Sequence, residues 1–168
     1  MTARFGLTPP EVFALPAFAY FAVVAVAVSA ADIRSHRIPN RIVYPSYAVS
    51  TALIAVASLG GGWAFVRAVA GAAALFAVYL LLAWAVPQGL GFGDVKLAGL
   101  IGLHLAWLGW GDLIAGTLLA FLLGGIHAIV LLVLGRAGRG TRIAFGPWML
   151  AGAVGTILLG TSPLVPGS

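Results

Sequence analysis

Four carboxylates are the only acidic side chains in this chain of 168 residues, so each can be considered separately. Glu11 and Asp112 each stand just before a long apolar run, where an acid favours the start of a helix. Asp32 ends one apolar run and Asp94 begins another. A charged group at the depth of a membrane is costly and marks a functional site by default. We therefore take Asp32 and Asp94 as the candidate chemical groups.

The residues around Asp94 read Gly91-Phe92-Gly93-Asp94-Val95-Lys96-Leu97. We expect the two glycines to adopt backbone angles that other residues avoid and to let another segment approach closely. Because Asp94 begins an apolar run, the helix N-terminus is expected to favour its ionised form. Lys96 either extends toward lipid headgroups or lowers the pKa of a nearby aspartate, which gives it a supporting role.

The segment after Asp32 reads Ile33-Arg34-Ser35-His36-Arg37-Ile38-Pro39-Asn40. Pro39 and Asn40 are residues that end a turn and cap the next helix, so we expect them at the start of the second helix.

Two carboxylates that meet can carry out general acid–base chemistry on a peptide bond. Like charges a few Å apart do not both ionise easily, so the pair shares one proton. The ionised member takes a proton from water, and the protonated member donates a hydrogen bond to the scissile carbonyl. The chain has no Cys, no Gly-x-Ser-x-Gly motif and no His pair with metal-ligand spacing. We therefore expect no metal, no cofactor and no covalent intermediate.

The composition indicates where this chemistry takes place. The chain is 62% hydrophobic and only 8% charged, whereas soluble domains average about 45–50% apolar and about 25% charged residues. This excludes a soluble enzyme, a nucleic-acid-binding module and a disordered chain. We predict one integral membrane domain over residues 1–168. The apolar run 12–31 is long enough to span a bilayer and lacks the charged flank of a signal peptide, so it is interpreted as a span.

The apolar runs and their Gly or Pro breakers predict an all-α, polytopic protein of about six transmembrane helices. Small residues within these runs are expected to let the helices pack closely: Gly99, Gly102, Gly116, Gly124, Gly125, Gly152 and Gly155. The predicted spans are Val12–Ala31, Ile42–Leu59, Ala64–Val86, Val95–Trp107, Leu113–Leu134 and Ile143–Leu159.

The basic residues predict the orientation. Seven of the nine lie in three alternate loops, 32–41, 87–96 and 135–142, while Arg4 and Arg67 fall on the other side. The positive-inside rule places these three loops in the cytoplasm, in contact with anionic lipid rather than nucleic acid. Asp32 and Asp94 are then on the same, cytoplasmic face, although 62 residues separate them in the sequence.

Asp32, the Ile38-Pro39-Asn40 run and the Gly91–Leu97 segment together resemble the type IV prepilin peptidase family of bacterial membrane aspartic proteases. The later Phe145-Gly146-Pro147 run is similar to an element of that family's last span. The resemblance implies that Asp32 and Asp94 are catalytic, supported by Gly91, Gly93, Lys96, Pro39 and Asn40. It implies a prepilin or pilin-like partner, whose short basic leader is removed at the cytoplasmic face of the inner membrane.

Many members of that family carry an additional N-terminal region with paired Cys-x-x-Cys motifs and also N-methylate their product. Here about 11 residues precede the first apolar run, and there is no Cys. The sequence resembles the short, peptidase-only form, so we expect no methyltransferase activity and no S-adenosylmethionine binding.

Three other interpretations stay open at this point. A transporter would use the two acids as a proton or cation site, with the acids near mid-span and broken helices there. A non-catalytic assembly subunit would tolerate the loss of either aspartate. A presenilin-type protease would carry a Tyr-Asp motif deep in a span, whereas Asp32 follows Ala31. The sequence specifies no oligomeric state.

The three histidines carry no catalytic prediction. His36 lies among arginines and is expected to be solvated. His104 and His127 lie within apolar runs, where each needs a polar partner such as a neighbouring helix.

Overall fold

The computed structural model describes residues 9–35, 38–59, 62–85, 90–136 and 144–159. The described residues form helices and no strand, so the all-α prediction is confirmed, and a helix is found at each of the six predicted positions. These helices are α1 (Pro9–Ser35), α2 (Asn40–Ala57), α3 (Gly62–Ala85), α4 (Phe92–Leu108), α5 (Trp110–Val133) and α6 (Gly146–Leu159).

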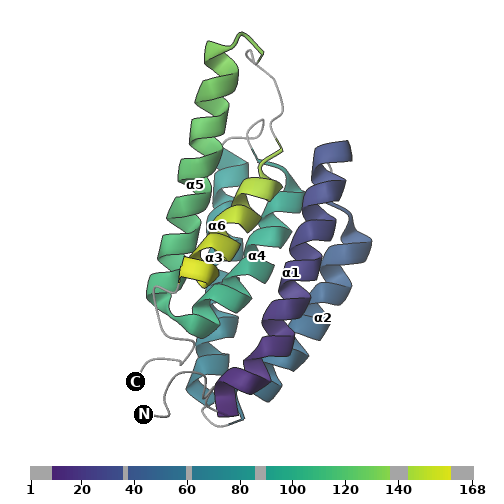
Figure 1. The fold of residues 1–168 in the computed structure, drawn as a ribbon, viewed down its shortest axis with the longest axis vertical. Helices are drawn as coiled ribbons and strands as arrows, with labels where there is room; N and C mark the ends of the chain where they lie inside the picture. The colour runs from purple at the N-terminus through teal and green to yellow at the C-terminus, as the bar shows by residue number, and fades with distance from the viewer. Residues whose placement is uncertain (1–8, 36–37, 60–61, 86–89, 137–143, 160–168) are drawn as a thin grey trace, which may run out of the picture.

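Consecutive helices run in opposite directions, and α4 passes through the middle of the bundle (Figure 1). Every residue of α4 from Leu97 to Leu108 is buried. A helix that is apolar on all sides must be surrounded by other helices, and this explains why α4 shows no polar face.

The chain is a membrane protein in which three helices have the length and composition to cross a bilayer alone. These are α1 from Phe13 onward, α3 and α5, while α6 is a shorter apolar helix. The faces that α5 leaves exposed are apolar, as at Leu118 and Leu122. Of the six spans that the sequence predicts, the remaining helices are shorter or more polar than these three. The 17-residue α4 is covered by its neighbours.

Pairs of glycines bring neighbouring helices together. A Cβ added at Gly102 of α4 would lie 2.6 Å from the carbonyl oxygen of Gly71 in α3, and one added at Gly152 of α6 would lie 2.6 Å from the carbonyl oxygen of Gly116 in α5. The predicted packing role of Gly102, Gly116 and Gly152 is confirmed. The prediction is wrong for Gly125, where an added Cβ would contact nothing within 4 Å.

A buried arginine closes the C-terminal end of α4. Arg67 of α3 donates hydrogen bonds from Nε to the carbonyl of Ala106, at 2.6 Å, and from its Nη2 to the carbonyls of Trp107 and Leu108, at 2.6 and 3.0 Å. The last carbonyls of a helix have no partner within the helix, and in an apolar surrounding an unpaired carbonyl is costly. Arg67 therefore has a structural role at this end of the bundle.

Candidate active site

The two candidate aspartates lie at the same end of the bundle, where α1 ends and α4 and α6 begin (Figure 1). Asp32 is buried near the end of α1, and its Oδ2 accepts a hydrogen bond from the backbone N–H of Gly146 at 3.2 Å. Asp94 lies in the first turn of α4, and its Oδ2 accepts the N–H of Gly91 at 3.0 Å. Each carboxylate is thus held by a backbone donor at the start of a helix.

Ile38 connects the two halves of this site. A Cβ added at Gly93 would lie 2.9 Å from the Cβ of Ile38, and a Cβ added at Gly146 would lie 3.3 Å from the Cδ1 of Ile38 and 2.7 Å from Oδ2 of Asp32. The side chain of Ile38 therefore packs on the backbone beside both aspartates. The expectation that Gly93 allows close approach is confirmed.

The other expectation for the glycines is wrong. Gly91 has φ −84° and ψ 154°, an extended conformation open to any residue. Among the described glycines, Gly135 alone has a positive φ, and it lies beyond the end of α5. A Cβ added at Gly91 would be 3.5 Å from Oδ2 of Asp94, which is ordinary contact. Gly91 thus contributes its N–H rather than unusual backbone geometry.

Lys96 and Asn40 fasten α2 to the start of α4. The Nζ of Lys96 donates to the side-chain oxygen of Asn40 at 2.9 Å and lies 4.9 Å from the ring centroid of Tyr44. The hydroxyl of Tyr47 donates to the backbone carbonyl of Lys96 at 2.6 Å. These contacts join α2 to the helix that carries Asp94.

Pro39 and Asn40 lie at the start of α2, as predicted, but the expected side-chain cap is absent. Pro39 occupies the cap position, and no side chain there makes a capping hydrogen bond. Asn40 is already the first residue of the helix, and its side-chain oxygen accepts the hydrogen bond from Lys96. The same amide that suits a helix cap thus serves an interhelical contact.

The carboxyl of Asp94 precedes the predicted span Val95–Trp107 and lies in none of the three helices long enough to cross a membrane alone. Burial raises the pKa of Asp94 to about 6; the hydrogen bond from Gly91 opposes this shift, and the charge of Asp32 adds to it. We expected the helix N-terminus to favour the ionised form, but desolvation outweighs it. The negative charge of Asp32 thus disfavours ionisation of Asp94.

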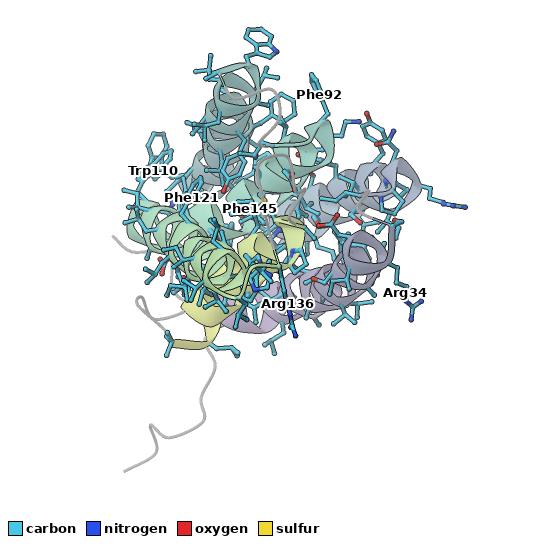
Figure 2. All side chains as sticks on the ribbon, turned by 90° about the horizontal axis from the view of Figure 1, so that it is seen from above. Arg34, Phe92, Trp110, Phe121, Arg136 and Phe145 are labelled. Atoms are coloured by element: carbon cyan, nitrogen blue, oxygen red, sulfur yellow. The ribbon has the colours of Figure 1, made fainter. Side chains whose placement is uncertain are left out.

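Three aromatic rings form a cluster next to this site. The ring centroid of Tyr79 in α3 lies 5.7 Å from that of Phe121 in α5 and 6.5 Å from that of Phe145, and the last two rings are 5.4 Å apart. Figure 2 shows Phe121 and Phe145 close together between α5 and α6, whereas Phe92 points away from the bundle. Nothing in the sequence distinguishes Tyr79 or Phe121, because each is one aromatic residue in an apolar run.

His104 and His127 make their contacts with groups other than Asp32 and Asp94. Nδ1 of His104 is 2.9 Å from the carbonyl oxygen of Leu100 in its own helix. The ring of His104 stacks on that of Phe21 in α1, with 4.3 Å between the two ring centroids. The ring of His127 is 4.8 Å from that of Trp148. His36 lies outside the described residues.

Asp112 is found where the sequence places it, in the first turn of α5, at the opposite end of the bundle from Asp32 (Figure 1). Unlike a typical surface helix start, it is buried. Within the part of the chain that the structure describes, no group of three or more His, Cys, Asp or Glu residues could hold a metal ion.

Residues 19–129, which include both aspartates, match the type IV leader peptidase family. A prepilin leader peptidase/N-methyltransferase of Burkholderia pseudomallei is 32% identical over 165 residues, which cover 95% of this chain and 50% of that protein. One from Escherichia coli K12 is 37% identical over 142 residues, covering 82% and 60%. The chain spans about half the length of the curated relatives it matches. No solved structure is significantly similar to it.

Proposed function

Because this chain belongs to the type IV leader peptidase family, we propose that it is a membrane aspartic endopeptidase that removes the leader of prepilins or pilin-like proteins. The observation that carries the proposal is that Asp32 and Asp94, which are 62 residues apart in the sequence, lie at the same end of the bundle, with Ile38 packed on the backbone beside both. Each carboxylate also has a backbone donor that holds it in place. This arrangement suits a pair that shares one proton.

We infer different roles for the two carboxyls from their surroundings. Burial and the charge of Asp32 favour the protonated form of Asp94, which makes Asp94 the general acid. In a pair that shares one proton, Asp32 is then the ionised member and the general base, and the N–H of Gly146 holds its carboxylate in place.

Peptide cleavage then needs no group beyond water and the pair. Asp32 takes a proton from water as the water oxygen attacks the carbonyl carbon of the scissile bond, while Asp94 donates a hydrogen bond to the carbonyl oxygen. Asp94 transfers its proton to that oxygen, so the intermediate is a neutral gem-diol beside protonated Asp32 and ionised Asp94. As the C–N bond breaks, Asp32 gives its proton to the leaving nitrogen, and Asp94 takes a proton from one hydroxyl of the gem-diol, which becomes the carboxylic acid. Asp32 is then ionised and Asp94 protonated, as at the start.

The charges at the two ends of the bundle support a cytoplasmic site. Arg34, Arg41 and Arg136 are exposed at the end that carries the aspartates. Arg67, which the charge pattern of the sequence places on the opposite side of the membrane, is buried and donates hydrogen bonds to backbone carbonyls. It is therefore not a surface charge, and the bias toward the site end is stronger than the sequence alone indicates. A substrate whose cleavage site lies just outside its apolar helix would meet the aspartates at this level.

The test uses the purified full chain in detergent with a synthetic prepilin fragment that contains the leader and the start of the apolar helix. Mass spectrometry measures cleavage. Asp32→Asn and Asp94→Asn should each lower the rate roughly 100-fold or more, because Asn can neither act as the base nor share the proton. The double variant should be hardly slower than either single variant, since the two residues act as a unit.

Asp112→Asn is the matched control, because it makes the same chemical change at a buried aspartate at the other end of the bundle. It should keep the cleavage activity, whatever its effect on stability. If Asp32→Asn cleaves at the rate of the wild type, the two-aspartate mechanism is wrong, and a transporter or an assembly subunit becomes the better interpretation.

A further inference from the structure

Tyr79 lies on α3 at the level of Asp94. Along the antiparallel pair α3 and α4, Gly71 meets Gly102, and further along Phe76 meets Gly99. Continuing this register by one more turn brings Tyr79 level with residues 94–96, the first turn of α4. Only 1% of Tyr79 is exposed.

The ring of Tyr79 also lies near the segment whose backbone N–H binds Asp32. Its centroid lies 6.5 Å from that of Phe145. Phe145 directly precedes Gly146, whose N–H donates to Oδ2 of Asp32. Tyr79 therefore packs next to the helix that carries one aspartate and next to the backbone donor of the other.

The hydroxyl of Tyr79 is a polar group in an apolar core, and such groups require a hydrogen-bond partner. The charge of Asp94 acts on this hydroxyl. Oδ2 of Asp94 accepts the N–H of Gly91, which leaves Oδ1 for a second donor. Asp94 is therefore the acceptor best suited to the hydroxyl.

We infer that Tyr79 is a positioning residue of the peptidase: its hydroxyl hydrogen-bonds the carboxyl of Asp94 in the hydrated site and keeps that carboxyl turned toward Asp32. This inference rests on the proposed function. A carboxyl held by two donors loses the freedom to rotate about its last bond. Correct orientation of an acid contributes to the chemical step rather than to substrate binding.

The direct test is Tyr79→Phe, which removes the hydroxyl and keeps the ring contacts with Phe121 and Phe145. We expect kcat for prepilin cleavage to fall about 10-fold or more and KM to change less than about twofold, as for an interaction made in the transition state. Tyr20→Phe is the matched control. It removes a hydroxyl that lies 3.3 Å from Oγ of Ser46, in the contact between α1 and α2, and should keep the kcat of the wild type.

A second measurement does not depend on activity. In a double-mutant cycle of Tyr79→Phe and Asp94→Asn, the midpoint of thermal unfolding in detergent reports whether the two side chains interact. We expect Tyr79→Phe to shift the midpoint by different amounts in the wild type and in the Asp94→Asn variant, because the partner of the hydroxyl has changed.

Two results would overturn the inference: an unchanged kcat in Tyr79→Phe, or equal shifts in both backgrounds of the cycle. Either would leave Tyr79 as a packing residue and would not affect the proposed peptidase function. That function fails separately, if Asp94→Asn still cleaves prepilin.

Discussion

At the scale of single residues, the protonation of Asp94 has a consequence for stability. A carboxyl whose pKa is raised on folding, here from 3.8 to about 6, costs folding free energy whenever it is ionised. The cost is complete above about pH 6, decreases as the pH falls through that value, and is absent below the unfolded pKa. Asn resembles the neutral carboxyl and avoids the cost at every pH.

Asp94→Asn should therefore unfold at a higher temperature than the wild type at about pH 8, and this gain should shrink toward about pH 4. Thermal unfolding of both proteins in the same detergent at a series of pH values measures the difference. Asp112→Asn provides the comparison with another buried aspartate. A gain that stays constant over this range would show that burial of Asp94 does not raise its pKa.

At the scale of helices, the crossing of α3 and α4 depends on the absence of a side chain at Gly102. A Cβ there would lie 2.6 Å from a backbone oxygen and 3.0 Å from the Cα of Ala72, and a backbone cannot move aside as the end of a long side chain can. We expect Gly102→Ala to destabilise the protein by about 1–3 kcal/mol, the usual cost of overpacking. Unfolding in detergent measures this change.

The control for Gly102→Ala is Gly125→Ala in α5, where the added Cβ contacts nothing within 4 Å. Ala is a better helix former than Gly, so this variant should be unchanged or up to about 1 kcal/mol more stable. Equal effects of the two substitutions would mean that the close approach of α3 and α4 is not required.

The start of α2 is the element that joins the two halves of the site. Ile38 packs on Gly93 and beside Gly146, Asn40 accepts a hydrogen bond from Lys96, and Tyr47 donates to the backbone of Lys96. Because α2 contacts both α1 and α4, it sets the distance between them. This explains how two carboxylates on different helices are kept in a constant arrangement.

At the scale of the whole molecule, the orientation in the membrane can be tested directly, because the chain has no native Cys. Ser35 is exposed at the end of α1 near the aspartates, and Gly111 is exposed at the start of α5, at the opposite end. In intact cells, a maleimide that does not cross membranes should label Gly111→Cys and should label Ser35→Cys only after permeabilisation.

Both variants should keep prepilin cleavage, which would show that they are folded and inserted. Labelling of Ser35→Cys from outside would place the aspartates on the outer face and would contradict a cytoplasmic site.

The sequence by itself determined the membrane class, the six helices and the two aspartates on one face. These features depend on properties that are local in the chain: runs of apolar residues, Gly and Pro breakers, and the spacing of basic loops. Two helices separate Asp32 from Asp94 in the sequence, and a chain that crosses the membrane an even number of times returns to the same face. Counting the helices was therefore enough to predict that both aspartates lie at one end of the bundle.

Only the tertiary structure decided how the site is assembled. The donor to Asp32 comes from Gly146, 114 residues further along the chain, and Asn40 pairs with Lys96 rather than capping its own helix. Such choices depend on which helices are neighbours, and helix neighbours in lipid are set by the close fit of small residues rather than by apolarity, which all faces share. For the same reason the raised pKa of Asp94 could not be foreseen, because burial depends on the helices that surround it.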